Sequence, residues 1–181
     1  NLKAPLKDTS NKEYWSYSLL KEMYPGDKVI HYHINEKAIV AVSEVSSEWK
    51  KETVNWTPSK KALIKDNFRP GQLVELRNFK RIRPIGLNRI QKKNTQVKFI
   101  IDDLKKRFGS SYFPFSPKTR DRPHLSTNEG YAFILTQEFV DLFPSLEKSF
   151  SLDTNEKKSK KLKYQKGSSQ SNQKKSTPKG S

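Results

Sequence analysis

The sequence lacks cysteine, so disulfide bonds and thiolate metal sites are excluded. No apolar run approaches about 18 residues, and therefore no stretch predicts a helix that spans a membrane. A secretory signal pattern is also missing, which favours a cytoplasmic protein without a membrane partner. The chain starts at Asn1 rather than at methionine, from which we expect a fragment of a longer protein.

Catalytic signatures are missing as well. The sequence contains no GxxxxGK, HExxH or GxSxG motif. His31 and His33 alternate along a predicted strand and could share a metal, but no third ligand has a suitable spacing. The adjacent acids Asp102 and Asp103 fall in a predicted helix beside lysines, as surface ion pairs do. These observations favour a binding module over an enzyme and predict no catalytic residue, no metal site and no cofactor.

Acidic residues are scarce relative to basic ones. Lysine and arginine number 36 against 19 acids, which gives a formal net charge of +17. Residues 151–181 hold nine lysines, two acids and almost no apolar side chain, so we predict a disordered Lys-rich tail or linker. That tail carries +7, which leaves +10 on the predicted folded domain, residues 1–150. A folded domain this basic favours nucleic acid as its partner.

Apolar periodicity predicts an α+β fold. The predicted elements are a helix at 18–24, a hairpin of strands 28–34 and 38–49, a strand at 72–82, an amphipathic helix at 97–108, a strand at 130–136 and a helix that follows the N-cap Thr136. Residues 109–130 are rich in Gly, Pro and Ser and predict a long loop. Together these elements predict a curled sheet or small β-barrel with about three surrounding helices.

Three motifs in the same order resemble the EVE domains of the PUA superfamily. The first runs from residue 23 to residue 45, the second from 73 to 91, and the third from 130 to 143. The matching positions are Met23, Gly26, Asp27, Tyr32, His33, Ile39, Val40, Glu44, Val45, Pro84, Leu87, Thr136 and Phe139. Three features depart from the family pattern: Ala41 stands where a glycine is usual, residues 1–13 make a poor opening strand, and the loop at 109–130 is longer than expected.

The resemblance implies a PUA-like curled sheet or barrel with a pocket for one nucleobase. In the related YTH domains an aromatic cage holds N6-methyladenine, and Trp15 matches the position of the first cage tryptophan. An extruded base needs rings above and below it and hydrogen bonds at its Watson–Crick edge. The predicted base-pocket residues are Trp15, Ser16, Tyr17, Ser18, Tyr32, Trp49 and Trp56. The alternative for Trp15 is simple packing at the base of its helix, with Tyr14 and Tyr17 at the rim.

Basic residues near this pocket predict contacts with the nucleic-acid backbone. Arg77, Arg81 and Arg83 are expected on one face of the strand at 72–82, although such a run can also be a solvated face. The full predicted set is Arg77, Lys80, Arg81, Arg83, Lys118, Arg120 and Arg122. Phe113, Phe115 or Arg120 could fill the gap that a flipped base leaves.

Two functional hypotheses follow from the resemblance. In the first, the chain is a modified-base-specific DNA-binding domain, the non-catalytic reader of a modification-dependent restriction system, with base flipping into an aromatic pocket. Its nuclease or motor, of McrB-type or HNH-type, then lies outside this segment. In the second, the chain is a PUA/YTH-like RNA-binding protein that recognises modified or structured RNA.

Overall fold

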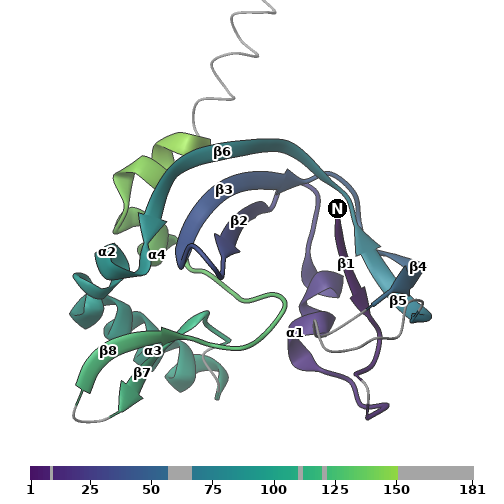
Figure 1. Cartoon of the computed structure of the whole chain (residues 1–181), viewed down its shortest axis with the longest axis horizontal. Coiled ribbons are helices and arrows are strands. Elements are labelled where there is room, and N and C mark those ends of the chain that lie inside the picture. The colour runs from purple at the N-terminus through teal and green to yellow at the C-terminus, as the bar shows by residue number, and fades with distance from the viewer. Residues whose placement is uncertain (9, 57–66, 110–111, 120–121, 151–181) are drawn as a thin grey trace, which may run out of the picture.

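Two three-stranded antiparallel sheets and one β-hairpin form the framework of the protein (Figure 1). The computed structural model describes residues 1–8, 10–56, 67–109, 112–119 and 122–150; of residues 118, 119, 122 and 123 it describes the backbone alone. The first sheet has the order β1-β5-β4, the second has the order β2-β3-β6, and β7 pairs with β8. The strands are β1 (Leu2–Pro5), β2 (Lys28–His33), β3 (Ala38–Val45), β4 (Lys50–Asn55), β5 (Phe68–Val74), β6 (Leu76–Gly86), β7 (Phe115–Thr119) and β8 (Arg122–Thr127).

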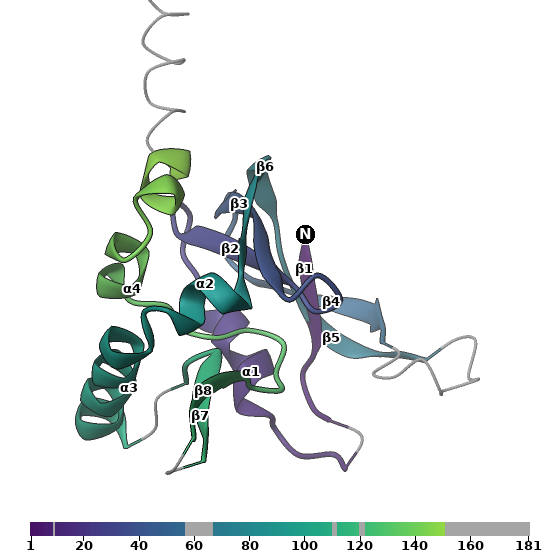
Figure 2. The same ribbon diagram turned by 60° about the vertical axis from the view of Figure 1, so that its left-hand side comes forward.

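Helical segments pack against this framework. They are α1 (Trp15–Ser18), the 3₁₀ turn η1 (Leu19–Glu22), α2 (Leu87–Gln91), α3 (Asn94–Phe108) and α4 (Gln137–Asp141), followed by helical residues 144–150. Figures 1 and 2 both place α3 and α4 on the side away from the β1-β5-β4 sheet. None of the helices in the described part of the chain combines the length and apolar content that a bilayer crossing needs.

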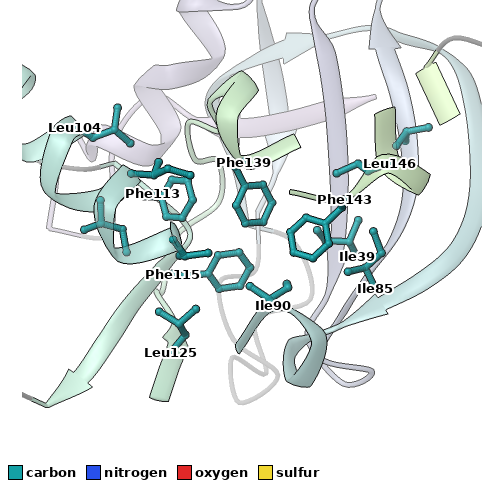
Figure 3. Close-up of a cluster of buried hydrophobic side chains, with 14 residues drawn as sticks. Ile39, Ile85, Ile90, Leu104, Phe113, Phe115, Leu125, Phe139, Phe143 and Leu146 are labelled. Carbon is teal, nitrogen blue, oxygen red and sulfur yellow. The ribbon is translucent and has the colours of Figure 1, made fainter. Parts of the chain in front are cut away.

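The larger hydrophobic core lies between one face of the β2-β3-β6 sheet and the helices α2, α3 and α4 (Figure 3). Four phenylalanines form its centre, and the rings of Phe115 and Phe139 are stacked with centroids 5.9 Å apart. Helix α3 contributes its buried residues Val97, Ile100, Ile101 and Leu104, whose spacing is that of one helical face. Gly109 then ends the helix in the left-handed conformation at φ 72°.

A smaller core joins α1 and η1 to the β1-β5-β4 sheet. Its fully buried members include Ala4, Leu20, Val45 and Val74. Tyr17, Trp49 and Tyr131 pack around them. This core fixes the position of the aromatic segment that begins at Tyr14.

Three irregularities bend the β2-β3-β6 sheet, one against β2 and two against β6, of which one lies between Ile39 and Ala41. Against β2 the register slips between His31 and Tyr32, so that Val40 has no direct partner there. Against β6 it also slips between Val42 and Glu44, and Asn78 adopts φ 55° at that point. An extra residue in one strand increases twist and reverses which face the following side chains occupy.

The α+β class and the curled sheet are confirmed, and the described residues form no closed barrel. The hairpin predicted at 28–34 and 38–49 is present as β2 and β3, and α3 matches the helix predicted at 97–108. The poor opening strand is β1, which pairs along β5. The predicted helix at 18–24 begins earlier, at Trp15, and continues as the 3₁₀ turn. The tail prediction for 151–181 lies outside the described residues.

Four detailed predictions were wrong. The strand predicted at 72–82 is two strands, β5 and β6, separated at Glu75, and the helices outnumber the three expected. Residues 109–130 contain the β7-β8 hairpin, because the Phe115 and Leu125 side chains are both buried in the larger core. Residues 130–136 form no strand: the Ile134 amide bonds singly to the Tyr112 carbonyl (2.9 Å) rather than joining a ladder. Thr136 occupies the N-cap position of α4, but its hydroxyl makes no capping bond.

Candidate nucleic-acid interface

Aromatic rings gather on both sides of α1. On one side the Trp15 ring contacts Tyr112 and Phe133, with centroids 5.2 and 5.6 Å away. On the other side Tyr17 contacts Trp56 at 5.5 Å. Tyr14 contacts both Trp15 and Tyr17 and therefore links the two groups. The two sides arise because residues two apart in a helix point about 200° apart.

Tyr17, Trp56 and Tyr131 form a closed triangle of rings. The centroid distances are 5.5, 5.2 and 6.3 Å, and each pair meets edge to face at 71° to 77°. Tyr131 is held at both ends: its amide donates to the Ser16 hydroxyl (3.1 Å), and its hydroxyl accepts from the Lys3 amide (2.9 Å). Burial raises the pKa of Tyr131, so its hydroxyl stays protonated near neutral pH.

A buried polar side chain is bonded to the backbone of Tyr17, one member of this triangle. Gln72, on the central strand of its sheet, is only 1% exposed. Its amide nitrogen donates to the Tyr17 carbonyl, which fixes the orientation of the amide because a carbonyl can only accept. The other end, Oε1, is buried and has no hydrogen-bond donor among the residues that the structure describes. A buried acceptor without a donor is costly, and such a group in a folded protein calls for a functional or structural reason.

The structure does not bring all the predicted pocket residues together. Trp15 and Trp56 belong to the two different ring groups and do not face each other as a sandwich. Trp49 packs on the smaller core with the Lys21 ammonium 6.0 Å from its ring centroid. Tyr32 packs against the larger core and contacts Phe115 at 5.9 Å. Sequence reasoning missed Gln72 and Tyr131.

The two predicted serines have partners within the protein. Ser16 is fully buried and accepts from Tyr131, while Ser18 donates to the Tyr14 carbonyl at 3.5 Å. Ser16 therefore positions Tyr131 rather than lying open to solvent.

The basic residues of β6 divide at the Asn78 bulge. Before it, Arg77 lies opposite Glu44 and forms an ion pair with it, and Glu44 also binds Lys28 at 2.7 Å. Hydrogen bonds from Lys28 and then from Arg77 lower the pKa of the Glu44 carboxyl to about 2. After the bulge, Arg81 lies opposite Ala41, on the other face. The prediction that Arg77 and Arg81 share a face was therefore wrong.

Arg81 and Arg83 are exposed, while Lys80 lies half-buried opposite Val42 on the core side. No described carboxylate forms an ion pair with any of these three cations. Arg120 lies outside the described residues, as do the side chains of Lys118 and Arg122.

Phe113 and Phe115 cannot fill the gap of a flipped base. They are 1% and 2% exposed and belong to the centre of the larger core (Figure 3). The suggested insertion of either ring is therefore wrong, because both side chains point into the larger core.

These features define a class of protein: a mixed α+β module with a curled sheet, an aromatic helix and an unpaired basic strand segment. The sequence profile of the EVE domain matches residues 10–120, which is more than half of the chain. The chain therefore belongs to the EVE domain family, whose members are PUA-like, and nucleic-acid binding is the activity that this membership implies. No curated protein matches the sequence.

Proposed function

We propose that this EVE domain recognises a modified base in DNA, extruded from the duplex, and serves as the specificity module of a modification-dependent restriction system. The nuclease or motor that acts on the recognised DNA then lies outside this chain, in the cytoplasm. The observation that carries the proposal is the buried Gln72 Oε1 acceptor, which has no donor among the described residues. The same side chain is bonded to the Tyr17 carbonyl, and the Tyr17 ring contacts Trp56 and Tyr131.

The Gln72 Oε1 acceptor suits a base with an exocyclic amino group. Adenine and cytosine present an N–H donor at that position, and N6-methyladenine and 5-methylcytosine keep at least one. The donor would satisfy Gln72 Oε1 while the base rests against aromatic rings, where stacking contributes about 1–3 kcal/mol per base. That range is comparable with the few kcal/mol that extrusion of a base costs. Trp15 and Tyr14, across α1, extend the aromatic surface.

The test is a binding panel in which only the modification differs. Duplexes of one sequence carry N6-methyladenine, 5-methylcytosine, 5-hydroxymethylcytosine or glucosylated 5-hydroxymethylcytosine, beside unmodified duplex and RNA. Trp56→Ala should weaken binding of the preferred duplex about 5- to 150-fold and leave the unmodified duplex nearly unchanged. Trp49→Ala is the matched control, since Trp49 is also half-buried but contacts the Lys21 ammonium rather than the ring triangle. Thermal melts of both variants monitor folding.

Two results would overturn the proposal. One is equal affinity for every modified duplex and the unmodified duplex. The other is an equal selective loss in both tryptophan variants. Preferential binding of modified RNA would favour the second hypothesis, a PUA/YTH-like RNA-binding protein, because a 2′-hydroxyl contact distinguishes the two nucleic acids.

A further inference from the structure

One large aromatic ring on the β2-β3-β6 sheet is mostly exposed to solvent. Phe79 lies within β6, at the point where the register with β3 slips, and is 65% exposed. The only ring it contacts among the described residues is His31, with centroids 5.4 Å apart at 64°. The Phe79 ring therefore has one supporting edge and leaves much of its surface to solvent.

The local backbone explains why Phe79 lies there. Asn78 takes a positive φ, and the register between β3 and β6 slips between Val42 and Glu44. This bulge places Phe79 on the face of the sheet away from the larger core. His31 is held in place beneath it by a 2.8 Å hydrogen bond between its Nε2 and the Ser43 hydroxyl.

A cation lies on the same face. His31 pairs with Ala41 across one strand boundary, and Ala41 pairs with Arg81 across the next, so the three form one row. Arg81 is exposed and follows Phe79 by two positions along β6. No residue of this row carries a carboxylate, and no described acid pairs with Arg81.

We propose that Phe79, supported by His31, is a stacking platform for an unpaired nucleobase, and that Arg81 binds the phosphate beside that base. An exposed ring next to an unpaired cation is the combination that sequence-tolerant single-strand binding uses. The positive charge of Arg81 favours a polyanion over an apolar protein partner. This second site is carried by a sheet other than the one with Gln72, and it requires no modified base.

The experiment measures binding of an unmodified single-stranded oligonucleotide that carries one 2-aminopurine, whose fluorescence falls when it stacks. Phe79→Ala should weaken binding about 5- to 150-fold and abolish the quenching. Phe79→Trp should keep both, whereas Phe79→Leu, which is apolar but has no π face, should lose both. Phe99→Ala is the matched control, because Phe99 is 76% exposed on α3 and should bind as the parent does.

Salt dependence separates the two parts of the site. Arg81→Ala should reduce the slope of log K against log salt by about 0.7, the single-strand value for one phosphate, whereas Phe79→Ala should leave the slope unchanged. Equal binding by Phe79→Ala and Phe99→Ala overturns the platform, and so does full binding by Phe79→Leu. Neither result bears on the modified-base pocket, which Trp56→Ala tests on duplex DNA.

Discussion

Replacement of Glu44 by glutamine should destabilise the protein, and the loss should depend on pH in a defined way. The Glu44 side chain is 14% exposed and receives Lys28 and Arg77 together. A pKa lowered from 4.5 to about 2 corresponds to at most about 3 kcal/mol of stability at neutral pH. Because the Lys28 and Arg77 side chains are 46% and 51% exposed, solvent screening reduces the expected loss to about 1–2 kcal/mol.

The sign follows from the direction of the pKa shift. Glu44 has a lower pKa when folded than when unfolded, so its stabilisation is complete above about pH 4.5 and is lost as the pH falls towards 2. The difference between the parent and Glu44→Gln should therefore be constant from about pH 6 to 7 and shrink to about half near pH 3.

Urea unfolding midpoints between pH 3 and 7 provide the assay, supported by thermal melts in which about 1–2 kcal/mol lowers the Tm by about 2–8 °C. Glu75→Gln is the control, because Glu75 also pairs with a lysine at 2.7 Å but lies at the surface. It should change stability little. A Glu44→Gln protein as stable as the parent at pH 7, or a difference that grows towards pH 3, would refute the reasoning.

Two further predictions concern single side chains. Arg81→Ala should lower the salt slope of duplex binding by about 0.9, equally for modified and unmodified DNA. Arg77→Ala should lower the slope less, because Arg77 is already paired with Glu44. Equal slopes for the two variants would contradict the different roles assigned to Arg77 and Arg81. Tyr32→Phe removes a hydroxyl that is buried without a partner among the described residues, so a thermal melt should show an unchanged or higher Tm. If Tyr32→Phe instead weakened binding of modified duplex at an unchanged Tm, Tyr32 would contact the base.

Strong periodicity made part of the fold predictable. The β2-β3 hairpin and α3 follow from local strand and helix patterns. The burial of α3 has the predicted helical spacing, whereas β3 is buried on both faces. The β7-β8 hairpin was missed because Pro117 and the surrounding glycine, proline and serine residues favour a loop. Its stability comes from the tertiary packing of Phe115 and Leu125, which the local sequence does not reveal.

The candidate site was less predictable than the fold. Tyr17 stands out in a short aromatic segment, but its neighbours Trp56, Gln72 and Tyr131 are 39 to 114 positions further along the chain. Only the packing of α1 against the β1-β5-β4 sheet brings them together. A local signal existed for Gln72, since a glutamine precedes the apolar pair Leu73 and Val74 in a strand. Nothing in the sequence indicates that its Oε1 has no donor among the residues that the structure describes.

The basic run of β6 shows why neighbouring cations in a sequence need not form one binding surface. Arg77 and Arg81 are four positions apart, and an unbroken strand would place them on one face. The extra residue at Asn78 separates them: Arg77 faces Glu44 and contributes to stability, whereas Arg81 shares a face with Phe79 and His31. One backbone irregularity thus assigns two arginines of the same strand to different tasks. It follows that stability and nucleic-acid affinity can be altered independently within β6, the first through Glu44 and the second through Phe79 and Arg81.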